Sequence, residues 1–75
     1  MQTTKHFWAY GVAAGQVVFV RCSTPDVARD ERNRMKLSDA KTVGSFSSVK
    51  VSEEHIRAYA LSRGWAIEAI RDAAQ

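Results

Sequence analysis

The side chains best suited to catalysis or metal binding are few and scattered in this sequence. Its two histidines, His6 and His55, and its single cysteine, Cys22, fall in three separate segments. No nucleophile stands at a spacing that predicts a catalytic pair with a base, and a metal site would need ligands from all three segments. Glu53 and Glu54 are adjacent carboxylates that suit the first turn of a helix. We therefore expect no enzymatic activity, no cofactor and no metal.

Positive charge is concentrated between residues 29 and 41, which is the strongest indication of an anionic partner. Five cations lie there: Arg29, Arg32, Arg34, Lys36 and Lys41. Three of them, Arg29, Arg32 and Lys36, recur at helical spacing and would form a stripe. Carboxylates are interleaved with the stripe, and the spacing of Asp30 and Arg34 predicts an i,i+4 ion pair. A solvated, self-paired face is the preferred interpretation, and a phosphate-binding track is the alternative.

The C-terminal third resembles a helix-turn-helix motif over about 20 residues. Small residues, a glycine and apolar residues recur in the required order: Ala60, Gly64, Trp65 and Ile70. The resemblance implies a recognition helix over residues 65–74 that offers Glu68 and Arg71 to a DNA groove. Arg63 occupies a position that should be hydrophobic, and the proposed recognition helix carries little positive charge. An ordinary helical hairpin is therefore the preferred alternative.

Two runs of aromatic and β-branched residues predict a β-hairpin over residues 6–23. Gly15-Gln16 is the expected turn, which places Val12 opposite Phe19; a turn at Ala14-Gly15 would divide the residues between the two faces in the same way. One face carries Trp8, Tyr10, Val12, Val17, Phe19 and Arg21. The other carries Phe7, Ala9, Gly11, Val18, Val20 and Cys22. Both faces are apolar, so each must be covered by the chain or by a partner.

The remaining residues predict a small α+β domain with element order β-β-α-β-α-α. A helix is expected over residues 25–36, after the capping residue Thr24 and Pro25. A short strand is expected over 46–51, and helices over 53–63 and 66–74, the first of them capped by Ser52 and ended by Gly64. The helix at 25–36 has little apolar surface. Either the C-terminal helices cover the second hairpin face, or the chain is incomplete without a partner.

Length and composition limit the classes of protein that this chain can represent. With 75 residues, 11 Lys and Arg, and 8 Asp and Glu, it forms one domain of net charge +3, which is weak support for nucleic-acid binding. The lone Cys22 excludes an internal disulfide and favours the cytoplasm. The apolar stretch at 7–20 is shorter than the roughly 20 residues of a membrane span, so we expect no membrane insertion.

These observations leave two hypotheses from different classes. The first is a small module that regulates or inhibits a larger protein complex by contact, by analogy with small chains of phages and mobile elements. Its contact residues would be Trp8, Tyr10, Phe19 and Arg21 on the hairpin, or Arg29, Arg32 and Lys36 on the helix. For the hairpin residues, burial beneath the C-terminal helices is the preferred interpretation. The second hypothesis is a transcriptional regulator that binds nucleic acid through Arg29, Arg32, Arg34, Lys36 and Arg71. A homodimer is left open in both.

Overall fold

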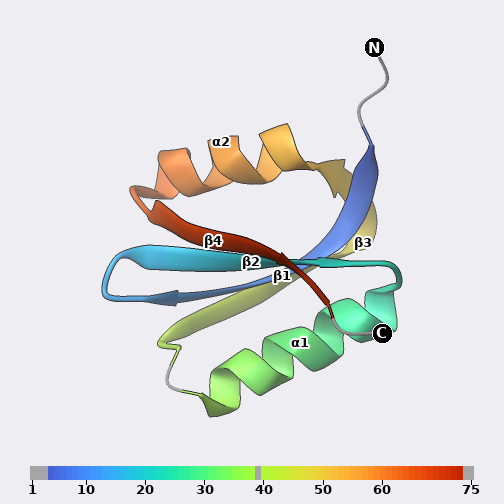
Figure 1. Cartoon of the computed structure of the whole chain (residues 1–75), viewed down its shortest axis with the longest axis horizontal. Coiled ribbons are helices and arrows are strands. Elements are labelled where there is room, and N and C mark those ends of the chain that lie inside the picture. Colours follow the sequence, from blue (N-terminus) through green and yellow to red (C-terminus); the bar gives the residue numbers. More distant parts are fainter. Residues whose placement is uncertain (1–3, 39, 74–75) are drawn as a thin grey trace.

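A four-stranded mixed sheet with one helix on each face forms the centre of the computed structural model, which describes residues 4–38 and 40–73 (Figure 1). In chain order the elements are β1 (Lys5–Ala13), β2 (Gln16–Cys22), α1 (Pro25–Leu37), β3 (Thr42–Ser52), α2 (Glu53–Arg63) and β4 (Ala66–Asp72). The strands lie in the order β3-β1-β2-β4, antiparallel except for the parallel pair β2 and β4. The α+β class is confirmed, whereas the sixth element is a strand and not a helix.

The hairpin has the predicted faces but its turn lies one residue earlier than the expected Gly15-Gln16. Ala13 pairs with Gln16 and Val12 with Val17, so Ala14 and Gly15 form the two-residue loop. Both loop residues have positive φ, 53° and 77°, as a type I′ turn requires. This turn follows the right-handed twist of the strands, which explains why it is adopted although Ala14 has no intrinsic preference for a left-handed conformation.

Each face of the sheet carries its own hydrophobic core. On the side of α2, the buried residues are Trp8, Val12, Val17, Phe19, Ile56 and Ala60. On the side of α1, they are Ala9, Val20, Cys22, Ala28 and Ala73. The Trp8 indole N–H donates to the carbonyl of Val51 at 2.9 Å, so the largest buried ring is also satisfied as a donor. The preferred interpretation of the aromatic hairpin face, burial beneath a C-terminal helix, is confirmed for α2.

Local capping signals place the two helices where they are expected. The Thr24 hydroxyl accepts from the Val27 N–H, and the Ser52 hydroxyl accepts from the His55 N–H, each at 3.2 Å. α2 ends at Gly64, which has φ 77°. Neither helix of the described residues is long and apolar enough to cross a membrane.

The strand β3 is longer than the predicted 46–51 because it pairs along almost the whole of β1. Its first residues are small and polar, and they resemble a loop in isolation. In the structure Thr42 is opposite Val12 and Gly44 is opposite Tyr10. Cross-strand pairing therefore overrides a weak local preference.

The predicted helix at 66–74, whose residue 74 lies outside the described residues, is wrong, and so are the helix-turn-helix and the helical hairpin that depended on it. Residues 66–72 form β4, which pairs with β2. The register passes from Val17 opposite Ile67 to Val18 opposite Ala69, so Glu68 is an extra residue in a β-bulge. The bulge places Ile67 and Ile70 on the same face, toward the α2 core. A spacing of three in a bulged strand thus imitates the period of a helix.

Candidate functional site

The aromatic residues predicted as a protein contact lie inside the α2 core. Trp8 and Phe19 are 0% exposed. Tyr10 is half-buried, and its hydroxyl lies 3.2 Å from that of Tyr59. Burial and this hydrogen bond raise the pKa of Tyr10 to about 12. Trp8 and Phe19 therefore present no surface to a partner in this conformation, and their role here is to hold α2 on the sheet.

Arg21 lies at the edge of the same core and is fully engaged by its neighbours. Its guanidinium carbon lies 5.2 Å from the centroid of the Trp8 ring. Nη1 is 2.6 Å from Oδ1 of Asp72 and Nη2 is 2.9 Å from Oε1 of Glu53. These contacts tie β2 to β4 and to α2. The structure thus gives Arg21 a positioning role within the fold.

The predicted basic stripe on α1 is only partly available to a partner. Arg29 forms an ion pair with Asp26, Arg32 is half-buried and Lys36 is exposed. Arg34 pairs with Glu31 at 2.8 Å, whereas the sequence predicted a pair with Asp30. The Glu31 side chain is only 13% exposed. This partner turns Arg34 away from the stripe, toward the side of α1 that faces β4.

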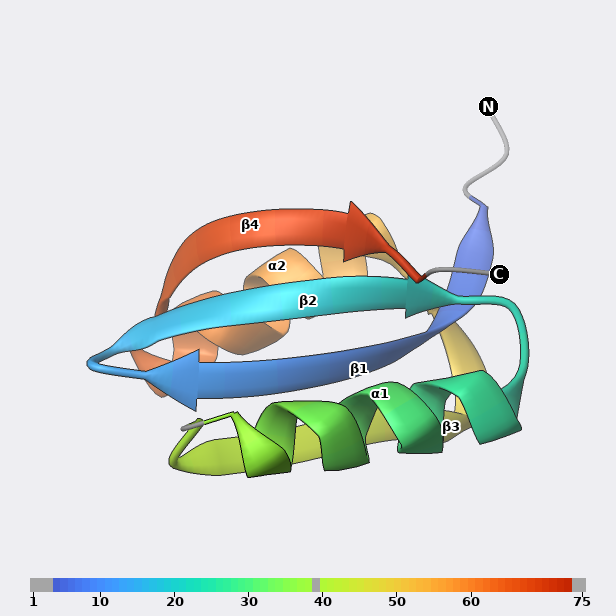
Figure 2. The same cartoon turned by 60° about the horizontal axis from the view of Figure 1, so that its bottom comes forward.

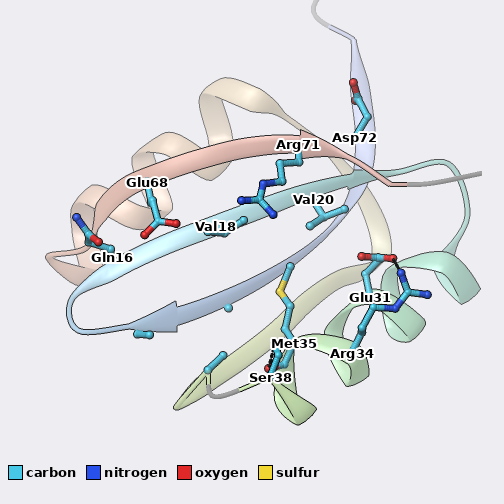
Figure 3. A pocket seen from close by; sticks show the side chains of 13 residues that line it. Gln16, Val18, Val20, Glu31, Arg34, Met35, Ser38, Glu68, Arg71 and Asp72 are labelled. Atoms are coloured by element: carbon cyan, nitrogen blue, oxygen red, sulfur yellow. Dashed lines mark hydrogen bonds and ion pairs between the residues drawn. The ribbon is translucent and has the colours of Figure 1, made fainter.

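A groove with a volume of about 530 Å³ lies between α1 and β4 (Figure 3). The hairpin contributes the floor with Gly11, Ala13, Gln16, Val18 and Val20. One wall comes from α1 and the residues that follow it, with Glu31, Arg34, Met35, Ser38 and Ala40. The other wall is β4, with Glu68, Arg71 and Asp72. Three segments distant in the sequence therefore meet at this groove.

The floor of the groove is apolar and its walls are charged. Val18 is half-buried and Val20 is 5% exposed. Glu68 and Arg71 are exposed and lean from β4 over β2 (Figure 3). Neither of them forms an ion pair within residues 4–38 and 40–73, in contrast to the paired charges on α1. A largely apolar floor beside two unpaired charges of opposite sign on one wall is suited to binding an amphipathic ligand.

The groups considered first for chemistry lie outside this groove. Cys22 is buried, its thiol donates to the Val20 carbonyl at 3.3 Å, and burial raises its pKa to about 11. The thiol is therefore protonated at neutral pH and a poor nucleophile. Within the described part of the chain, no three His, Cys, Asp or Glu side chains lie close enough to hold a metal ion.

Sequence reasoning named Arg34 and Arg71 among its candidates, and the structure brings these two into one groove. Glu68 was expected only as part of a DNA-recognition helix, and Val18, Val20 and Met35 were not predicted as contact residues. The sequence feature that could have located this groove is the small apolar face of the helix at 25–36, which indicated that this helix would cover one hairpin face incompletely. Comparison with protein families, curated proteins and solved structures finds no match to this chain, so the geometry carries the functional argument.

Proposed function

We propose that this chain is a non-enzymatic module that binds a segment of a larger protein in the groove between α1 and β4. It regulates or inhibits that protein by occupying the segment. The observation that carries the proposal is the half-buried Val18 on β2, which lies beside the unpaired charges of Glu68 and Arg71 on β4. Water-exposed apolar surface bordered by polar groups is the usual composition of a protein contact.

The unequal cover of the two sheet faces supports this proposal. α2 packs against both edge strands, β3 and β4, and so crosses the sheet. α1 packs mainly on β3 and β1 (Figure 2). α1 also reaches the second part of β2, where Ala28 packs in one cluster with Val20 and Cys22. The first part of β2, around Val18, and the neighbouring part of β4 are left without a helix. A domain of this size buries only a small hydrophobic core. A partner bound on this part of the sheet would complete the layer that α1 forms on this face.

Binding of nucleic acid is the second candidate function, and one observation favours it. β3 packs against α1 and carries Lys50 but no carboxylate, so the strand beside the basic helix adds a positive charge and no negative one. The ion pair of Arg29 with Asp26 reduces the positive charge of that helix. A titration with random-sequence duplex decides between the candidates, since phosphate binding weakens steeply between low and moderate salt. The absence of binding to the duplex at low salt would exclude nucleic-acid binding as the function.

A capture experiment with matched variants tests the protein-binding proposal. The tagged chain, Val18→Glu and Val49→Glu are used as baits in extracts of the source cell, after circular dichroism has shown that each is folded. Val49 is 61% exposed on β3, at the opposite edge of the sheet, and so provides a control for the substitution itself. A stoichiometric partner should be retained by wild type and Val49→Glu and lost from Val18→Glu. Retention by Val18→Glu would refute the groove as the contact.

The same capture experiment tests the cellular compartment in which the protein acts. The reduced Cys22 thiol supports a cytoplasmic location as a proposal, and the captured partner should then be a cytoplasmic protein. A secreted partner would contradict this location.

A further inference from the structure

We infer that the ligand of this groove is an amphipathic α-helix of between two and three turns, which lies beside α1 over β2 and β4. The inference rests on the proposed function and specifies the chemistry of the partner. It is derived from the width of the uncovered strip, the length and shape of its floor, and the position of its two free charges.

The width of the strip fits one helix. Neighbouring strands lie about 4.8 Å apart, and a helix with its side chains is about 10 Å across. One helix therefore covers about two strands. Since α1 lies mainly on β3 and β1 and reaches only the second part of β2, the space over the first part of β2 and the neighbouring part of β4 corresponds to a short second helix of the same layer. Figure 2 shows α1 beside β3 and β1, toward the sheet edge opposite β4.

The floor of the groove is short and lined mostly by small side chains, which allows a partner helix to approach the sheet closely. It extends from Gln16 to Val20 along β2, or about 13 Å at roughly 3.3 Å per residue. A helix covers that distance in about nine residues. Apolar side chains at positions i, i+3 or i+4, and i+7 of the partner would then rest mainly on the half-buried Val18 and Met35.

The two free charges set the polar edge of the partner helix. Glu68 lies at the level of Val17 and Val18, whereas Arg71 is opposite Val20. They are therefore separated by roughly 8 Å along the strand direction, within about 2 Å of the roughly 6 Å between residues i and i+4 of a helix. We expect an acidic side chain of the partner at Arg71 and a basic one, four residues away, at Glu68.

Two other occupants fit these observations less well. An extended segment added to the edge of β4 would meet the bulge at Glu68, and bulges and charged side chains weaken edge pairing. A second copy of the chain would need a helix with a free apolar face. The large apolar side chains that the two described helices leave exposed are one on each, Leu37 on α1 and Leu61 on α2, and a single leucine does not form the apolar stripe of a helix.

Selection from a display library of random 12-residue peptides tests the inference. The full chain is the bait, and Val18→Glu is used for counter-selection. Enriched peptides should show the apolar spacing of a helix with an acid and a base four residues apart. Arg71→Glu should weaken their binding roughly tenfold, and changing the acid of the peptide to lysine should restore it. The exposed position of Arg71 keeps this second variant folded if Val18→Glu is not.

Several results would overturn the inference. These are enriched peptides with the alternating pattern of a strand, enriched peptides that bind Arg71→Glu and wild type equally, or no enrichment over Val18→Glu. A concentration-dependent dimer in sedimentation that Val18→Glu abolishes would also refute it in favour of a second copy. If Val18→Glu loses the cellular partner but the selected peptides are extended, only the helix is refuted. If Val18→Glu retains that partner, the proposed function itself fails.

Discussion

Replacing Gly44 by alanine should destabilise the fold through the Tyr10 ring. A Cβ at Gly44 would lie 2.5 Å from Cζ and 2.9 Å from Cε2 of Tyr10, closer than van der Waals contact allows. The ring is packed among four other aromatic rings, with centroids 5.7 to 5.8 Å away: Phe19, Phe46, Tyr59 and Trp65. It therefore cannot move without disturbing the α2 core.

The expected loss can be worked out from these contacts. Overpacking of this kind costs about 1–3 kcal/mol, and displacing the hydroxyl from Tyr59 removes a hydrogen bond that contributes about 0.5–1.5 kcal/mol. Alanine also reduces the entropy of the unfolded chain, which offsets about 0.4–1 kcal/mol. The net loss is roughly 2 kcal/mol, which lowers the Tm of a domain of this size by about 8–16 °C.

Urea unfolding followed by tryptophan fluorescence measures this loss, and a double-mutant cycle tests its cause. Tyr10→Leu removes the atoms that the new methyl group would meet. Adding Gly44→Ala to Tyr10→Leu should therefore cost much less than adding it to the wild type. The reasoning is refuted if Gly44→Ala changes the free energy of unfolding by less than about 0.5 kcal/mol. It is also refuted if its cost is the same in both backgrounds.

Three further predictions concern the turn, the thiol and the coupled tyrosines. Ala14→Asn should stabilise the fold by about 0.5–1 kcal/mol in the same urea assay, since Asn tolerates the positive φ of this type I′ turn; unchanged stability would contradict the strain at Ala14. Cys22 should react with an aromatic disulfide reagent at neutral pH only as fast as the protein unfolds, because burial raises its pKa to about 11; rapid reaction in the native state would contradict its burial. Because the pKa of Tyr10 is raised to about 12 in the folded state from 10 in the unfolded state, the unfolded chain binds fewer protons at high pH. Stability should fall between pH 10 and 12 by more in wild type than in Tyr10→Phe, and parallel curves would exclude this linkage.

Much of the fold follows from signals that lie close together in the sequence. Thr24 and Ser52 cap the two helices, and Gly64 ends the second, so these boundaries are encoded within a few residues. The faces of the hairpin follow from its alternation and are independent of where the turn lies. In contrast, the extent of β3 depends on β1 and the existence of β4 depends on β2. Pairing between distant segments cannot be read from local preference.

The candidate site was harder to predict because it depends on which face each helix covers. Trp8 and Phe19 are residue types that are common both in protein contacts and in hydrophobic cores. They lie in the core because α2 packs over them. Val18 and Arg71 belong to one groove only because β4 pairs with β2. Arg71 was predicted for its charge, on a helix that does not form. The small apolar face of α1 indicated that one face of the sheet would be incompletely covered, but it did not indicate which strands would be left uncovered.

The parallel pairing of β4 with β2 has a consequence for the order of assembly. Gln16 and Ala66 are 50 residues apart in the sequence and neighbours in the sheet, so this contact closes a long loop, at a high entropic cost. The hairpin can form from local contacts before residues 66–72 have been synthesised. We therefore expect one wall of the groove to be added late in folding and lost early in partial unfolding. Binding at the groove would clamp this strand to the sheet, and the partner would recognise only a chain that has finished folding.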